Sequence, residues 1–237
     1  FTVIMNVCML SPEYPPYIVG GLGAHVDHLV PELVEKGVHV HVVTPRLAGG
    51  EVEEAAGLLG VSRVDGTHLP DDFLERTALL NEAMYRRALA IVSTEPGPWL
   101  VHAHDWLVAD AAIRLTQDRR MPFLATIHAT EFGRNQGIHN DIQSRVHNEE
   151  HRLATESDAI IACSRFMANQ IREIFSVPST KLEVIPNGVD VQRLIEPDFD
   201  RVAFRRQYAR DDEPIVLYVG RLVGEKGIYV LLDAIPR

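Results

Sequence analysis

The most informative segment of the chain is Pro15-Pro16-Tyr17-Ile18-Val19-Gly20-Gly21-Leu22-Gly23-Ala24-His25. It follows an apolar run at residues 3–9 and opens a segment whose apolar residues recur at helical spacing from Val26 until Gly37 ends the pattern. This order predicts a strand, a glycine-rich turn and a helix. Glycines let a ligand approach the backbone of the turn, and the free N–H groups at the helix start favour an anion, most often a phosphate.

The dinucleotide-binding fingerprint G-x-G-x-x-G relies on the same physics, but this sequence departs from it. Val26 stands where the third glycine is required, and the next apolar run, residues 38–43, leads into Thr44-Pro45-Arg46 without an acid for a ribose hydroxyl. The sequence therefore argues against an NAD enzyme. A glycine-rich turn that serves packing alone is the open alternative for this stretch.

Composition indicates an ordinary globular protein. Of the 237 residues, 46% are hydrophobic and 24% are charged, and the net charge of -10 argues against a nucleic acid as the main partner. Cys8 and Cys163 both lie in apolar runs, which favours a reduced, cytoplasmic protein. No apolar run approaches the ~18 residues of a transmembrane segment, and residues 1–10 lack the basic start of a signal peptide.

Short apolar runs alternate with helical patterns along most of the chain. We expect strands at residues 3–9, 38–43, 100–103, 123–127, 159–162 and 182–185, and helices at about 22–36, 71–93, 107–117, 141–156 and 165–175. This pattern predicts an α/β fold with a Rossmann-like parallel sheet and helices on both faces. The glycine-rich residues 47–70 are expected to form a hairpin or an excursion.

A change of composition marks an expected domain boundary. Residues 190–214 are rich in charge and proline, so we expect one domain at 1–195 and a linker with the start of a second, truncated Rossmann-like domain at 196–237. In that second part, residues 215–219 predict a strand and a helix begins at about Ile228. The chain is accordingly expected to be a fragment of a longer protein.

Polar residues follow the predicted strands, at the edge where such sheets bind ligands. They are Gly20, Gly21 and Gly23; His102, His104 and Asp105; His128, Thr130 and Glu131; Ser164 and Arg165; Asn187 and Gly188; and Arg221 with Lys226. Any one of them is explained by the usual polarity of loops. Together, helix-start amides and two cations suit a diphosphate, while histidine and aspartate suit sugar hydroxyls or a reacting centre.

Several motifs occur in the order seen in retaining glycosyltransferases of the GT-B fold. They are Tyr14-Pro15-Pro16 with Gly20-Gly21-Leu22-Gly23, His102-Ala103-His104-Asp105-Trp106, Thr126-Ile127-His128, Ile185-Pro186-Asn187-Gly188-Val189-Asp190, and Gly220-Arg221-Leu222-x-x-x-Lys226-Gly227. The chain resembles family 4 of these enzymes over essentially its whole length and is similar to bacterial and archaeal glycogen synthases. The last two motifs are specific when both occur at this separation, whereas Gly-Gly-Leu-Gly alone is weak.

The resemblance implies a role for each matching position. Asp105 and His128 are expected to be catalytic and to lie beside the donor sugar. The donor diphosphate is expected to contact Gly20, Gly21, Leu22, Arg221 and Lys226. Further contacts to the sugar or the acceptor are expected from His104, Glu131, Ser164 and Asn187.

The implied activity is retaining transfer of a hexosyl group, expected to be glucosyl, from a UDP-, ADP- or GDP-hexose to a carbohydrate or other hydroxyl acceptor. The resemblance implies no metal and no cofactor besides the nucleotide sugar.

The sequence departs from the family pattern at two places. Ile18 stands where related glycogen and starch synthases have a lysine, and the acidic Glu-x7-Glu motif of the family is missing from this chain, so the chain alone is expected to be inactive.

Three other readings stay open at this stage. His147-Asn148-Glu149-Glu150-His151 matches the zinc pattern H-x-x-E-H, although its charged surroundings favour a solvated helix face. A sugar-nucleotide epimerase or a phosphorylase of the same fold is a second alternative. A non-catalytic nucleotide-sugar-binding fragment is the third.

Overall fold

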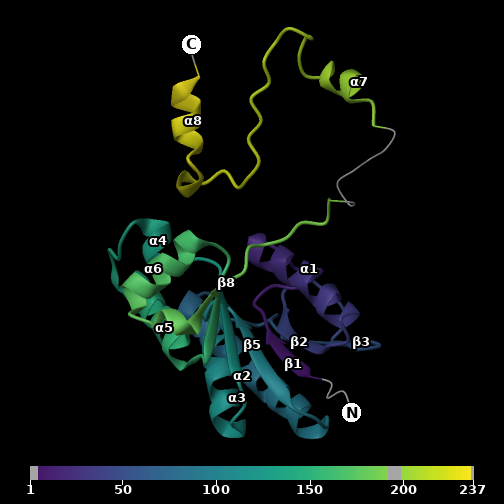
Figure 1. Ribbon diagram of the computed structural model, residues 1–237, viewed down its shortest axis with the longest axis vertical. Coiled ribbons are helices and arrows are strands. Elements are labelled where there is room, and N and C mark those ends of the chain that lie inside the picture. Colours follow the sequence, from purple (N-terminus) through teal and green to yellow (C-terminus); the bar gives the residue numbers. More distant parts are fainter. Residues whose placement is uncertain (1–4, 192–198, 236–237) are drawn as a thin grey trace. The chain divides into compact units, whose positions relative to one another are not determined.

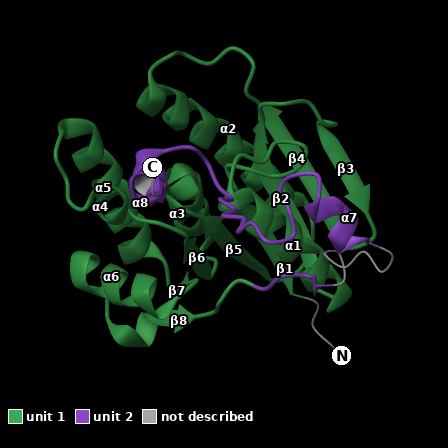
Figure 2. Cartoon of the chain, turned by 90° about the horizontal axis from the view of Figure 1, so that it is seen from above, with its two compact units in different colours: residues 1–187 green, residues 188–237 purple. Residues whose placement is uncertain are grey.

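The computed structural model describes residues 5–191 and 199–235, and the chain divides into two compact units, Phe1–Asn187 and Gly188–Arg237 (Figure 2). Each unit is described by itself. The first unit holds the sheet and the larger helices (Figure 1). Within the described part of the chain, no helix combines the length and the apolar character that a membrane crossing requires.

The first unit is built on an eight-stranded sheet with the order β3-β4-β2-β1-β5-β6-β7-β8. Its strands are β1 (Asn6–Leu10), β2 (His39–Arg46), β3 (Glu53–Ala56), β4 (Leu59–Asp65), β5 (Trp99–His104), β6 (Phe123–Ile127), β7 (Ala159–Ala162) and β8 (Leu182–Val184). Every pair is parallel except β3 with β4. The predicted parallel sheet is confirmed, and the irregular stretch at 47–70 contains a hairpin that turns at Gly57, whose φ of 60° favours glycine.

Helices cover both faces of this sheet. They are α1 (Gly21–Glu35), α2 (Phe73–Thr94), α3 (Ala109–Arg119), α4 (Glu131–Asn135), α5 (Asp141–Glu156) and α6 (Arg165–Phe175), with a 3-10 turn, η1 (Trp106–Val108), before α3. In β1, Cys8 and Leu10 pack with α2 and α3, whereas Val7 and Met9 pack with α1, because successive side chains of a strand point to opposite faces. The same alternation places His102 and His104 of β5 on the face opposite Val101 and Ala103, which is the face that α1 covers.

The second unit contains α7 (Arg201–Arg205), η4 (Gly224–Lys226) and α8 (Ile228–Ala234). The helix expected from Ile228 is confirmed, but the strand expected at 215–219 is wrong. These residues pair with no other strand in the described residues, and Leu217 and Val219 are 79% and 85% exposed. A strand forms only when a neighbour pairs with its N–H and carbonyl groups, and apolar content alone does not provide that neighbour.

A buried asparagine fixes the connection between β5 and α3, where several of the candidate site residues lie. Asn81 of α2 is 2% exposed, and its Nδ2 donates to the Leu107 carbonyl at 2.7 Å and to the Thr77 carbonyl at 2.8 Å. Its Oδ1 accepts from the Ala111 N–H at 2.9 Å. Both polar ends of the amide are therefore used to hold the main chain around η1.

Replacing this amide is expected to destabilise the first unit. Asn81→Ala leaves the Leu107 carbonyl and the Ala111 N–H without their partner, which should lower the free energy of unfolding by about 2–4 kcal/mol. Urea denaturation followed by circular dichroism measures this loss. Asn169→Ala, at an exposed position of α6, is the matched control and should stay within about 0.5 kcal/mol of the parent. Equal stabilities of the two variants would contradict the role given to Asn81.

Candidate active site

The glycine turn between β1 and α1 presents main-chain N–H groups at the carboxyl edge of the sheet. Gly20 precedes α1 in an extended conformation, and no side chain among the described residues caps the helix there. Glu13 Oε2 accepts hydrogen bonds from the N–H groups of Val19 at 2.9 Å and Gly20 at 3.2 Å. The N–H groups of Gly21 and Leu22 follow in the first turn, where a helix offers them no internal partner.

Glu13 and Gly23 explain the shape of this turn. A Cβ at Gly23 would lie 2.6 Å from Glu13 Oε2, so only glycine lets the carboxylate reach the turn. Glu13 was not among the predicted site residues. Gly20, a predicted diphosphate contact, donates its N–H to Glu13 in this structure.

Asp105 lies directly after β5 in a strained conformation. Its φ of 60° and ψ of 173° fall in a region that is essentially restricted to glycine. Oδ1 accepts from the His128 N–H at 2.7 Å, and the Asp105 N–H donates to the Thr126 carbonyl at 3.0 Å. Burial raises the pKa of Asp105 to about 6, although the hydrogen bond from His128 acts in the opposite direction. Strain held in place by hydrogen bonds is common at functional sites.

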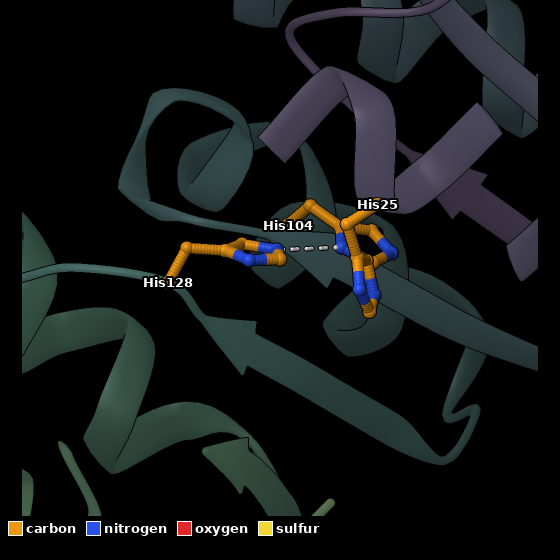
Figure 3. A group of neighbouring side chains, drawn as sticks. All are labelled: His25, His104 and His128. Carbon is orange, nitrogen blue, oxygen red and sulfur yellow. Dashed lines mark hydrogen bonds between the residues drawn. The ribbon is translucent and has the colours of Figure 1, made fainter. Parts of the chain in front are cut away.

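Three histidines from three different elements meet beside Asp105 (Figure 3). His25 comes from the second turn of α1, His104 from the end of β5 and His128 from the loop after β6. His104 Nδ1 lies 3.1 Å from His128 Nε2, and the ring centroids of His25 and His128 are 4.8 Å apart. Burial lowers the pKa of all three rings, that of His128 to about 3, so the cluster is uncharged at neutral pH.

Neighbouring side chains hold the histidines in place. His25 Nδ1 lies 2.9 Å from Asn187 Oδ1, and His128 Nδ1 lies 3.8 Å from Cys163 Sγ. The predicted residues His104, His128 and Asn187 are thus brought together by His25, which was not among the predicted site residues. Its position three residues after Leu22 and four before Leu29, on the face of α1 that packs on the sheet, was the available signal.

Two predicted contact residues have structural partners at their strand ends. The Ser164 hydroxyl accepts from the Met167 N–H at 3.1 Å and caps α6. Glu131 begins α4, and its Oε1 accepts from Asn135 Nδ2 at 2.8 Å. Arg221 and Lys226 belong to the second unit, where the Arg221 carbonyl accepts from the Tyr218 hydroxyl at 2.7 Å and Lys226 ends η4.

Glu150 is a buried carboxyl group, so its predicted position on a solvated face is wrong. The H-x-x-E-H motif was expected on a solvated face, but Glu150 is 2% exposed and its Oε1 accepts from the Glu131 N–H at 2.7 Å. His147 and His151 pack against the Phe175 ring, with centroids 5.2 and 5.9 Å apart. Burial raises the pKa of Glu150 to about 8. This motif therefore supports the start of α4 and the loop that carries His128.

A pocket of about 510 Å³ lies beside the glycine turn. Glu13 and Tyr17 line it from the turn, and Thr67 and Arg76 add polar groups. Phe73 and Leu107 contribute apolar surface. A hollow of this size with mixed lining is typical of a small-molecule site.

The chain is similar to known proteins of one family. Residues 19–193 match the family described as Glycosyltransferase Family 4. Over 249 residues the chain is 36% identical to a glycogen synthase of Mycobacterium tuberculosis, and the match covers 98% of this chain and 58% of that protein.

Solved structures confirm the expected GT-B fold. A sucrose-phosphate synthase from Thermosynechococcus elongatus superposes with a TM-score of 0.76 at 23% identity, covering 97% of this chain and 59% of that one. The catalytic domain of starch synthase IV from Arabidopsis thaliana, bound to ADP and acarbose, gives 0.66 at 17% identity, covering 98% of this chain and 66% of that one. The chain thus spans a little under three fifths of the glycogen synthase and the sucrose-phosphate synthase.

The buried Glu150 carboxyl predicts a pH-dependent stability. Between its ordinary pKa of 4.5 and the raised value of about 8, the unfolded chain has lost this proton while the folded chain keeps it. Stability should therefore fall as pH rises from 5 to 8, by up to about 1.4 kcal/mol per pH unit. Glu150→Gln keeps the acceptor for the Glu131 N–H but cannot titrate, so it should gain stability relative to the parent across this window.

Urea denaturation at pH 5, 6.5 and 8 compares the two proteins. The raised pKa of Asp105 acts in the same direction but is present in both, so the difference isolates Glu150. Glu156→Gln, an exposed acid at the end of the same helix, is the control. Parallel stability curves for the parent and Glu150→Gln would show that Glu150 is ionised in the folded protein.

Proposed function

Since this chain belongs to glycosyltransferase family 4, we propose that the protein transfers a hexosyl group, in the simplest case glucosyl, from a nucleotide sugar to an acceptor hydroxyl with retention of configuration. One observation carries the proposal. His25 of α1 contacts His128 beside Asp105, so the helix start that can bind a phosphate adjoins a group of polar side chains that can bind a sugar. The transfer chemistry requires these two kinds of site side by side.

The start of α1 is proposed to bind the departing nucleoside diphosphate. Cleavage of the donor leaves growing negative charge on the diphosphate, and preformed N–H groups stabilise this charge without reorganisation. The amides of Gly21 and Leu22 are the available donors, because Gly20 already donates to Glu13. Arg221 and Lys226 of the second unit are proposed to supply the positive charge, so that no metal ion is needed in the reaction.

Asp105 and His128 are proposed to act on the sugar. A carboxylate near the anomeric carbon stabilises the oxocarbenium-like transition state of glycosyl transfer. The His128 N–H is committed to Asp105, which leaves its carbonyl and its neutral ring for contacts with sugar hydroxyls. His104 and Asn187 are proposed as further polar contacts through the histidine cluster. Glu131 and Ser164 are proposed to lie at its rim.

The pocket beside Glu13 and Tyr17 is proposed to receive the acceptor. Its polar groups Thr67 and Arg76 suit a molecule rich in hydroxyl groups, and it adjoins the turn where the diphosphate is proposed to bind. The glycogen, starch and sucrose-phosphate synthases among the similar proteins support a carbohydrate acceptor. The nucleotide is proposed to be ADP, UDP or GDP.

Removal of either cation from the second unit tests the diphosphate role. Arg221→Ala and Lys226→Ala, made in an active protein that includes this chain, should each lower turnover about 10²-fold or more, because each removes charge that stabilises the transition state. Nucleotide release from a panel of sugar donors is the assay. Lys36→Ala, at the exposed C-cap of α1, is the matched control and should keep full turnover. Unchanged turnover in both variants would exclude the phosphate role.

His128→Ala tests the role at the sugar. If the ring acts on the reacting sugar, the variant should lose at least about tenfold in turnover while the KM for the donor changes little. Steady-state kinetics with varied donor separates the two parameters. His28→Ala, at an exposed position of α1, controls for loss of a histidine. A raised KM with normal turnover would reassign His128 to ground-state binding.

A further inference from the structure

We propose that His25, His104 and His128 bind a divalent transition-metal ion such as Zn²⁺, and that the bound ion competes with the sugar substrate for this site. The proposal that the ion binds is based on the geometry of the three rings alone. The proposal that it competes with the sugar rests on the proposed function. In this scheme the ion is an inhibitor and takes no part in the transfer reaction.

The spacing of the three rings fits a metal ion. One nitrogen of each ring lies within 4.8 Å of the others, and the rings converge from α1, β5 and the loop after β6 (Figure 3). Two nitrogens bound to a tetrahedral zinc at about 2.0–2.1 Å are roughly 3.3 Å apart. His104 Nδ1 and His128 Nε2 are already 3.1 Å apart, so an ion can replace the proton between them with little movement. His25 then needs to approach by a small rotation of its side chain.

Hydrogen bonds outside the cluster select the nitrogens that face it. The Asn187 Oδ1 accepts from His25 Nδ1 at 2.9 Å, which leaves the lone pair of His25 on Nε2. On His128, Nδ1 faces Cys163 Sγ at 3.8 Å and Nε2 faces the cluster. Metal-binding histidines characteristically use their second nitrogen in this way, because that bond fixes the tautomer and the ring orientation.

His104 presents Nδ1 to the cluster, 3.1 Å from His128 Nε2, so Nδ1 is the ring atom placed for coordination. The ring is fully buried, and its Nε2 has no hydrogen-bond partner among the described residues. In the metal-bound ring Nε2 would carry the proton, and this buried N–H is a cost that the bond from Nδ1 to the metal must offset.

The chemistry of the ligands selects the kind of ion. All three ligands are imidazole nitrogens, and imidazole suits Zn²⁺, Co²⁺, Ni²⁺ or Cu²⁺ in preference to Mg²⁺ or Ca²⁺. Three histidine ligands leave a fourth position open to water, as in many zinc sites. An ion there would occupy the space where His128 and Asp105 are proposed to meet the sugar.

Metal titration of the chain tests the binding. After treatment with a chelator and its removal, isothermal titration with Zn²⁺ should show about one ion per chain, and Co²⁺ should give the visible absorption of a tetrahedral site. His25→Ala should weaken Zn²⁺ affinity at least tenfold, and Asn187→Ala by about tenfold through loss of the orienting bond. Mg²⁺ should give no comparable heat.

Two histidine variants serve as controls. His28→Ala lies on the same helix as His25 but is exposed, and His151→Ala removes the last residue of the H-x-x-E-H motif. Both should bind Zn²⁺ like the parent, and circular dichroism confirms that each variant is folded. The proposal would be overturned if the parent took up no stoichiometric Zn²⁺. It would also be overturned if His25→Ala and His128→Ala bound Zn²⁺ as the parent does. Loss of binding in His151→Ala alone would place the ion at the other motif.

A kinetic experiment tests the competition. In an active protein that includes this chain, micromolar Zn²⁺ should raise the apparent KM for the nucleotide sugar, and chelator should restore it. His25→Ala should need at least tenfold more Zn²⁺ for the same effect. Inhibition equal in both proteins would overturn the competition. Since the titration requires no turnover, its result is separate from that of the transfer assay.

Discussion

The hydrogen bond from the His128 main-chain N–H to Asp105 Oδ1, 2.7 Å long, is the contact on which the site depends. Asp105 leaves β5 in a glycine-like conformation, which costs about 1–3 kcal/mol for a residue with a side chain. A hydrogen bond to an ionised group contributes about 1.5–3 kcal/mol, which is enough to offset that cost. With the second bond from the Asp105 N–H to Thr126, it joins the end of β5 to the end of β6. His104 and His128 are therefore held at a fixed separation before any ligand arrives.

Burial sets the charge of this site. Burial raises the pKa of Glu150 to about 8 and lowers the pKa values of the histidines, so these groups are mainly neutral near pH 7. Asp105, whose pKa is raised only to about 6, stays mainly ionised. A diphosphate needs positive charge as well as N–H donors, and neutral rings provide none. The proposed roles of the two sets of residues follow from this difference in charge. Around the histidines the first unit offers dipoles and uncharged hydrogen-bonding groups, and Arg221 and Lys226 are proposed to supply the positive charge for the diphosphate.

The sequence predicted much of the fold because the buried strands and the packed helices carry strong periodicity. The order of strands and helices in the first unit followed from it, as did the position of the polar residues at strand ends. The features that were predicted wrongly are those that depend on tertiary contacts. Residues 215–219 are apolar enough for a strand, but a strand also needs a neighbour to pair with, and sequence pattern does not reveal one.

The main errors of prediction within the site concern buried polar residues. For one of these residues, the sequence pattern could have revealed the burial. Glu150 lies four residues after Val146 and three before Leu153, both buried, so helical spacing places it on the inner face of α5. The prediction of a solvated face was based on the charge of Glu150 and its neighbours and not on this spacing. Glu13 carried no such signal, because its contact with Val19 and Gly20 depends on a turn whose shape only the folded chain shows.

The same burial connects the proposed sugar site to the proposed metal site. A protonated imidazole can only donate hydrogen bonds, whereas a neutral one donates at one nitrogen and accepts at the other. Sugar hydroxyls also do both, so neutral histidines suit them better than charged ones. The lone pairs that make a neutral ring an acceptor are, however, the same lone pairs that bind a transition metal. A cluster of buried histidines that binds hydroxyl groups, as proposed, is therefore also expected to bind zinc. The proposed ion would have to displace the hydrogen bond between His104 and His128.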